Sequence, residues 1–249
     1  MLIKAGASKE DAVKVVQENG WLKAEHVESL LNKISVEKAL NWLNTDLRIH
    51  LTEDACVMLK QFPNLEVGKE IKGISHLHDV LSYMSNHLED ADAELWHHPE
   101  FCLYEGHKIQ DYTVRFPQKL SDLKYWGAHL GICVGSYGSR VHSGESIVFA
   151  LYKEDKPCVC VEIAGKDHSL NQVYGKHNSQ QPKELSKAIK DLMLRSNKRS
   201  LVDTSREMNL EYKEFDCKTL YKEAVYHVNQ RALQDAEYAQ FGLPIRGLF

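Results

Sequence analysis

The 249 residues of the chain are enough for one or two domains, and its 43% hydrophobic and 27% charged residues are typical of a soluble globular protein. A formal net charge of -4 excludes a general attraction to nucleic acid or to anionic membranes, so such a contact would need a local basic patch. No apolar run approaches the roughly 20 residues that span a bilayer, and the first residues lack the apolar stretch of a signal peptide. Six cysteines are too few for a disulfide scaffold in this length. We therefore expect a cytoplasmic protein that makes no membrane contact.

The first part of the chain, residues 1–65, has the pattern of a small helical bundle. Apolar residues recur at helical spacing over about 23–32 and 52–61, and between them Ser35 is placed to cap a third helix. We interpret Trp42 as a core anchor of this bundle rather than a platform for a ligand.

The second part, residues 74–249, is predicted to combine helices with an antiparallel sheet. It follows a connection with two glycines and begins with a helix over about 75–89. Short apolar segments separated by turn residues predict strands, and the short turns between the last three imply an antiparallel meander. The predicted strands cover residues 101–103, 112–116, 146–152, 158–163 and 170–174. The fold class expected for the chain is α+β, an antiparallel sheet flanked by helices and preceded by the helical bundle.

A short helix that starts near Pro117 is predicted to end near Gly127. A glycine-rich segment begins there and precedes the last three strands. Within it, Cys133 and Tyr137 would share a face if the segment is helical, although glycine is a poor helix former. Two interpretations of the glycines stay open, namely close packing against the sheet or the approach of a ligand. The five glycines are Gly127, Gly131, Gly135, Gly138 and Gly144.

The strand predicted over 158–163 alternates in a way that singles out a carboxylate. Val159, Val161 and Ile163 make one face, while Glu162 lies on the other face with two cysteines. A carboxylate on an otherwise apolar strand either reaches solvent or lines a site.

One functional hypothesis is an enzyme, a hydrolase or transferase, whose pocket lies where the glycine-rich segment meets the sheet. Glu162 is its candidate general acid or base and Cys133 a candidate nucleophile, with Tyr137, Gln172 and Asn178 as candidate ligand-binding residues. A cysteine among glycines and apolar residues is usually buried and unreactive, so for Cys133 we expect a buried, reduced and structural thiol.

No familiar cofactor or metal signature is complete. The sequence has no phosphate-binding loop, dinucleotide fingerprint, GxSxG or HExxH. The pair Cys158 and Cys160 lacks the second ligand pair of a structural zinc site, and His76 and His78 are two residues apart and cannot share a helical face. We therefore expect no cofactor and no metal.

A helix predicted over 183–196, together with the residues that follow it, collects the only local basic cluster. Its candidate nucleic-acid-binding residues are Lys187, Lys190, Arg195, Lys198 and Arg199. The cluster is either a solvated helix face or a phosphate-binding surface, and both interpretations stay open.

Several motifs in the second part resemble those of the PcfJ-like family of conjugative plasmids and phages. They are FPQKLSDLKYWG, CVGSY, the strand CVCVEI and the close LNQVYGKHN, in that order. The family's histidine before the cysteine is Ile132 here, which argues against cysteine–histidine chemistry. The matching positions are Pro117, Leu120, Leu123, Gly127, Cys133, Val134, Tyr137, Glu162, Gln172, Gly175 and Asn178.

The resemblance implies a mobile-element or phage context with nucleic-acid processing nearby. The leading functional hypothesis is accordingly an accessory or binding protein that contacts nucleic acid through the basic helix of residues 183–199. The N-terminal bundle is the candidate contact for a protein partner.

Overall fold

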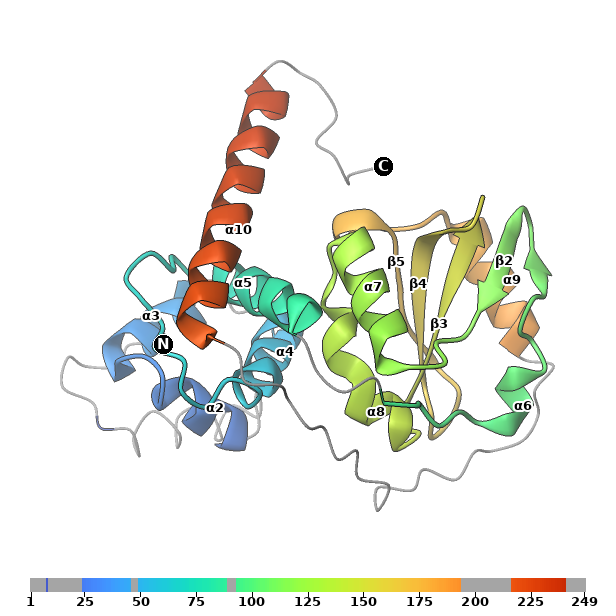
Figure 1. The fold of residues 1–249 in the computed structure, drawn as a ribbon, viewed down its shortest axis with the longest axis horizontal. Coiled ribbons are helices and arrows are strands. Elements are labelled where there is room, and N and C mark those ends of the chain that lie inside the picture. The colour runs from blue at the N-terminus through green and yellow to red at the C-terminus, as the bar shows by residue number, and fades with distance from the viewer. Residues whose placement is uncertain (1–7, 9–23, 46–48, 89–92, 194–215, 241–249) are drawn as a thin grey trace. The chain divides into compact units, whose positions relative to one another are not determined.

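The computed structural model describes residues 8, 24–45, 49–88, 93–193 and 216–240 (Figure 1). It divides into two compact units, with the boundary between Ser85 and Asn86 and with residues 216–232 grouped with the first unit. The boundary at 65–74 expected from sequence stays a prediction. Among the described residues, no helix has both the length and the apolar character needed to cross a membrane.

The first unit consists of helices whose apolar faces pack together. Its core includes Leu30, Trp42 and Leu77, each almost fully buried, so the interpretation of Trp42 as a core anchor is confirmed. The helices are α2 (Ala24–Leu31), α3 (Val36–Thr45), α4 (Ile49–Leu59), most of α5 (Ile74–His87) and the first part of α10 (Cys217–Gln240).

Helix α10 begins where a side chain caps it. The Asp216 carboxylate accepts hydrogen bonds from the backbone N–H of Lys218 (3.0 Å) and Thr219 (3.2 Å), which satisfies donors that a helix start leaves unpaired. One turn further on, the Tyr221 hydroxyl accepts a hydrogen bond of 2.9 Å from Gly68 N–H. This bond attaches the helix to the loop that precedes α5.

The second unit is a five-stranded antiparallel sheet between two layers of helices. The strand order is β1-β2-β3-β4-β5, so each strand pairs with its sequence neighbours. The strands are β1 (Lys108–Ile109), β2 (Tyr112–Arg115), β3 (Ser146–Lys153), β4 (Lys156–Ala164) and β5 (Leu170–Tyr174). The predicted α+β class and the antiparallel meander of the last three strands are therefore confirmed.

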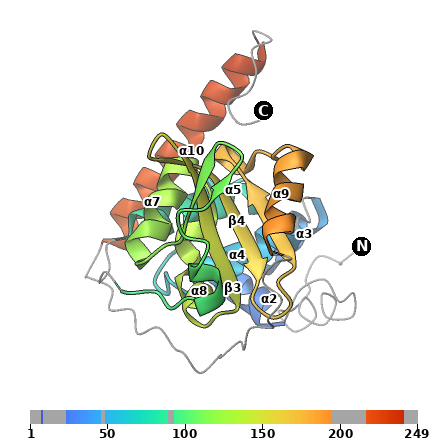
Figure 2. The ribbon, with the colours of Figure 1, turned by 90° about the vertical axis from the view of Figure 1, so that its right-hand side faces the viewer.

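One face of this sheet packs on α6 (Pro99–Cys102) and α9 (Lys183–Met193), and the opposite face packs on α7 (Leu120–Leu130), η1 (Cys133–Tyr137) and α8 (Gly138–His142). Figure 1 shows α7 and α9 on opposite sides of the strands, and in Figure 2 the strands lie between α7 and α9. The α9 side holds the main apolar core, to which β4 contributes Val159, Val161 and Ile163. The other face of β4 is thereby directed to η1.

Strand β1 was not predicted, and two further elements differ from the sequence prediction. Residues 101–103, expected to be a strand, belong to α6 or follow it directly, because Pro99 stands in its first turn and Phe101 is fully buried in the core. Helix α7 was expected to end near Gly127 but continues to Leu130. It stops at Gly131, whose φ of +65° is the left-handed conformation typical of a helix C-terminus.

His177 leaves no room for a side chain at Gly131, in addition to the left-handed backbone that favours glycine there. A methyl group on Gly131 would lie 2.4 Å from Nδ1 of His177, whereas at Gly106, with a similar φ of +76°, nothing lies within 4 Å. Gly106→Ala should lower the free energy of unfolding by about 1 kcal/mol, from backbone strain alone. Gly131→Ala should lower it by roughly a further 1 kcal/mol, because His177 must also move.

Chemical denaturation of the two variants measures the difference. In a Gly131→Ala background, His177→Ala should recover the additional loss but not the strain. Equal losses in Gly131→Ala and Gly106→Ala would show that the contact with His177 is unimportant.

Candidate functional site

A small cavity lies between the sheet and the η1 segment of the second unit. It is lined from four elements, namely η1 with the residue before it, β4, β5 and η2 (Lys176–Asn178). Its free volume is about 20 Å³, which is room for about one water molecule. The lining residues are Ile132, Cys133, Val134, Tyr137, Cys160, Glu162, Gln172, Tyr174 and Asn178.

The cavity brings together all five polar candidates that the sequence singled out away from the basic helix. These are Cys133, Tyr137, Glu162, Gln172 and Asn178. They are separated by as many as 45 positions in the sequence, and the antiparallel pairing of β4 with β5 places Glu162 directly opposite Gln172. The chemical roles expected for these residues stay predictions.

Glu162 is the buried carboxyl group of the cavity. Its side chain is only 8% exposed, and its Oε1 accepts a hydrogen bond of 2.7 Å from the hydroxyl of Ser146, which is also buried. Burying a carboxylate is costly unless hydrogen bonds compensate the lost water, and a donated hydrogen bond stabilises the ionised form. Ser146, which the sequence reasoning did not single out, is thus part of the site.

Cys133 forms the wall that faces the sheet strands. It is buried, makes no disulfide, and its thiol donates to the hydroxyl of Tyr137 at 3.8 Å. The guanidinium of Arg140 lies 4.8 Å from the centre of the Tyr137 ring, close enough for a cation–π contact that holds the ring in place. The expectation that Cys133 is buried is confirmed, and its reduced state and structural role stay predictions.

Cys160 is a lining residue that the sequence reasoning did not include. Burial, followed by the nearby Glu162 and Cys133, raises the pKa of its thiol far above the usual range. The signal was available in the alternation of β4, because Cys160 shares a face with Glu162. The thiol of Cys160 is therefore protonated and lines the cavity as an uncharged group.

Asn178 reaches the cavity from an unusual loop. Both His177 (φ +56°) and Asn178 (φ +60°) are left-handed, a conformation that asparagine tolerates better than most residues. Gly175 N–H donates to the carbonyl oxygen of Ser179 at 2.9 Å and so closes the loop. Asn178 itself is exposed and forms the rim of the cavity.

The basic helix lies on the other face of the sheet from the cavity. On α9, Leu185 and Ile189 are buried in the core, while Lys187 and Lys190 are exposed. The remaining candidates, Arg195, Lys198 and Arg199, lie outside the residues that the structure describes. Lys187 and Lys190 do not contribute to the cavity.

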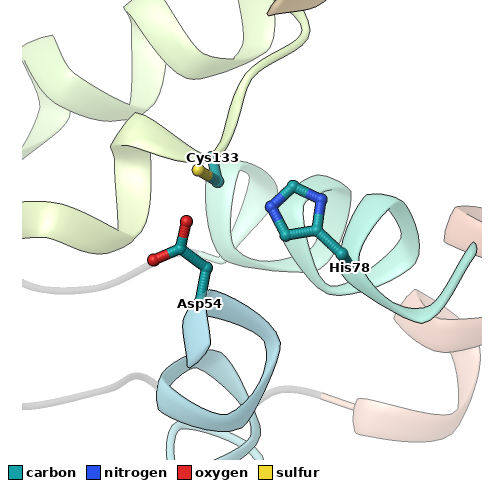
Figure 3. A group of neighbouring side chains, drawn as sticks. All are labelled: Asp54, His78 and Cys133. Carbon is teal, nitrogen blue, oxygen red and sulfur yellow. The ribbon is translucent and has the colours of Figure 1, made fainter. Parts of the chain in front are cut away.

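The first unit contains a second group of chemically active side chains. Asp54 on α4 and His78 on α5 face each other, with a carboxylate oxygen and a ring nitrogen within 4.8 Å (Figure 3). Nδ1 of His78, a residue only 2% exposed, also lies 3.2 Å from Oδ1 of Asp79. Figure 3 also draws Cys133, which belongs to the second unit.

Sequence reasoning considered His78 only as a partner for His76. The signal it missed is that His78 follows Ile74 by four residues and so interrupts the buried face of α5. An imidazole and a carboxylate are ligand types that transition metals take, which the expectation of no metal did not consider for this pair.

Comparison with protein families gives one match. The family model described as PcfJ-like protein matches residues 53–190, more than half of the chain. The chain belongs to the PcfJ-like family. The resemblance noted in the sequence is therefore confirmed, and the comparisons with curated proteins and with solved structures gave no match.

The matched PcfJ-like region includes every residue that lines the cavity. It also includes Asp54 and His78 of the first unit and the two exposed lysines of α9. The family match therefore extends across the boundary between the two units, beyond the motifs that carried the resemblance.

The contrast between two cysteines gives a prediction about the cavity. Cys160 is buried and its thiol pKa is raised, whereas Cys102 is exposed. Because the thiolate is the reactive form, iodoacetamide at pH 8 should alkylate Cys102 at least about 100-fold faster than Cys160. Peptide mapping of the native protein over time measures both rates, and equal rates would show that the cavity is open to the reagent.

Proposed function

We propose that this PcfJ-like protein is a hydrolase whose reaction centre is the cavity, with Glu162 as the general base. The observation that supports it best is a buried carboxylate, held by Ser146, beside a space of about one water molecule. In the proposed step, the Glu162 carboxylate takes a proton from a water molecule while the oxygen of that water forms a bond to an electrophilic carbon or phosphorus of the substrate. The protonated Glu162 then gives that proton to the departing group as its bond breaks.

The other polar groups of the cavity have supporting roles in this proposal. The amides of Gln172 and Asn178 come from β5 and from the rim, where they are placed to bind a polar part of the substrate. The Tyr137 hydroxyl already accepts a hydrogen bond from Cys133. Cys133 contributes the wall, and water rather than the thiol is the nucleophile.

The test uses the full chain and three chromogenic probes, namely p-nitrophenyl acetate, p-nitrophenyl phosphate and bis(p-nitrophenyl) phosphate. Glu162→Gln keeps the size of the side chain and an oxygen that can accept from Ser146. It should lower kcat/KM for the hydrolysed probe by about 10²- to 10⁴-fold, the usual contribution of general acid–base catalysis.

The matched control is Glu145→Gln, an exposed glutamate outside the cavity, which should leave kcat/KM unchanged. Circular dichroism and thermal melting establish that both variants are folded. Wild-type protein that turns over none of the three probes faster than Glu162→Gln would overturn the proposal.

A second candidate function is an accessory role beside nucleic acid in a mobile element or phage. It is supported by Lys187 and Lys190, which are exposed on α9 while the opposite side of the helix is anchored in the core. A helix fixed in this way presents its lysines at a constant spacing, as phosphate contacts require.

Salt dependence tests this second function. With single- and double-stranded 20-mer oligonucleotides, the logarithm of the association constant should fall linearly with the logarithm of the salt concentration. Removing both charges (Lys187→Gln with Lys190→Gln) should reduce that slope by roughly 1.8 on duplex, about 0.9 for each phosphate that a lysine no longer neutralises.

The matched control removes two exposed lysines at the ends of β4, Lys156 at its start and Lys166 in the turn after it (Lys156→Gln with Lys166→Gln), and should leave the slope unchanged. Equal slopes for wild type and the α9 variant would exclude these lysines as the phosphate-binding groups. Absence of any binding at low salt would exclude the function itself.

A further inference from the structure

The cavity wall formed by residues 132–134 is attached to a buried amide that does not line the cavity. Asn86, near the end of α5, is 9% exposed, and its Nδ2 donates a hydrogen bond of 2.9 Å to the carbonyl oxygen of Ile132. Ile132 immediately precedes Cys133, and both line the cavity. A single hydrogen bond thus connects Asn86 with the backbone of the wall.

The amide oxygen of Asn86 lies between Gly127 and Gly135. A methyl group would lie 2.2 Å from Oδ1 of Asn86 if placed on Gly127, and 2.1 Å if placed on Gly135. In glycine a hydrogen takes that place, so two Cα–H groups point at the oxygen, an arrangement worth much less than a full hydrogen bond. Among the described residues, Oδ1 accepts no conventional hydrogen bond.

Asn86 therefore contacts the segment 127–135 at its beginning, near its middle and at its end. Gly127 lies within α7 and Gly135 within η1, so one side chain spaces the two helices on either side of the wall. A shift of the backbone at Ile132 relative to Asn86 would break the hydrogen bond or bring the glycines onto the amide oxygen.

An apolar side chain of similar size would fill the same space without leaving an oxygen poorly satisfied. What it could not do is hold the carbonyl oxygen of Ile132, which would then be buried without this donor. The hydrogen bond from Asn86 to the carbonyl oxygen of Ile132 therefore explains why an amide is present at this position, whereas the packing of α5 does not.

We propose that Asn86 is a positioning residue, which sets the distance between the wall of residues 132–134 and Glu162. The proposal deepens the proposed hydrolase function, on which its catalytic significance rests. Asn86 touches no reacting atom and acts only through the backbone at Ile132.

Two cysteines on opposite walls of the cavity provide the test without any substrate. Cys133 lies on the wall that Asn86 holds, and Cys160 lies on β4. In the full chain, Asn86→Ala should raise the iodoacetamide reaction rate of Cys133 by about tenfold, the factor that corresponds to about 1.4 kcal/mol of easier local opening. The rate of Cys160 should stay within about twofold of wild type, because β4 is held by its own strand pairing.

Asn171→Ala, an exposed asparagine on β5, is the control and should change neither rate. If Asn86→Ala does not fold, Asn86→Ser gives the same comparison, since it shortens the side chain but keeps a polar group. An unchanged Cys133 rate would overturn the proposal. An equal increase at both cysteines would overturn it too, because it would reveal a general loss of stability.

The turnover of the chromogenic probes then separates the two proposals. Asn86→Ala should lower kcat more than it raises KM, because the wall shifts while the amides of Gln172 and Asn178 stay in place. Suppose that Asn86→Ala selectively raises the reaction rate of Cys133, but that the wild-type protein hydrolyses none of the probes. This result would reject the hydrolase function and leave the positioning role intact.

Discussion

Strand β4 has two different faces, and both the core and the cavity of the second unit depend on this difference. Val159, Val161 and Ile163 are buried against α6 and α9, and each such side chain contributes about 1.5–3 kcal/mol by leaving water. A slip of one residue in the pairing of β4 would reverse its two faces. It would move Glu162 into that apolar core and away from the hydroxyl of Ser146. The burial of three apolar side chains thus fixes the carboxylate in the cavity.

This constraint explains why much of the fold could be predicted from the sequence. Period-two alternation in β4 and short turns before and after it are local signals, and they predicted β3, β4 and β5, their antiparallel pairing and the face on which Glu162 lies. The candidate site followed from the same alternation and pairing. Polar residues that interrupt the same face of two paired strands lie next to each other in the sheet. Gln172 opposite Glu162 is the clearest instance.

What the sequence did not predict depends on contacts between residues far apart in the chain. Gly127 has the pattern of a helix end, but it lies inside α7, where the side chain of Asn86, 41 positions earlier, takes the place of a Cβ. Ser146 looked like an ordinary strand residue until the pairing of β3 with β4 placed its hydroxyl beside Glu162. The residues 101–103 became helical because Pro99 starts a turn that buries Phe101, a tertiary gain that outweighs strand propensity.

The glycines of the glycine-rich segment were open to two interpretations, and the contacts decide for packing at two of them. At Gly135 the space for a side chain is taken by Asn86 and by the backbone of Lys124, and at Gly131 it is taken by His177. Each of these partners belongs to a segment that shapes the cavity, the first through Ile132 and the second through the loop that presents Asn178. Backbone in the left-handed region persists only where its surroundings hold it, as at His177 and Asn178. The absence of a side chain at Gly131 and Gly135 therefore lets His177 and Asn86 approach the backbone directly, and this packing holds two borders of the cavity.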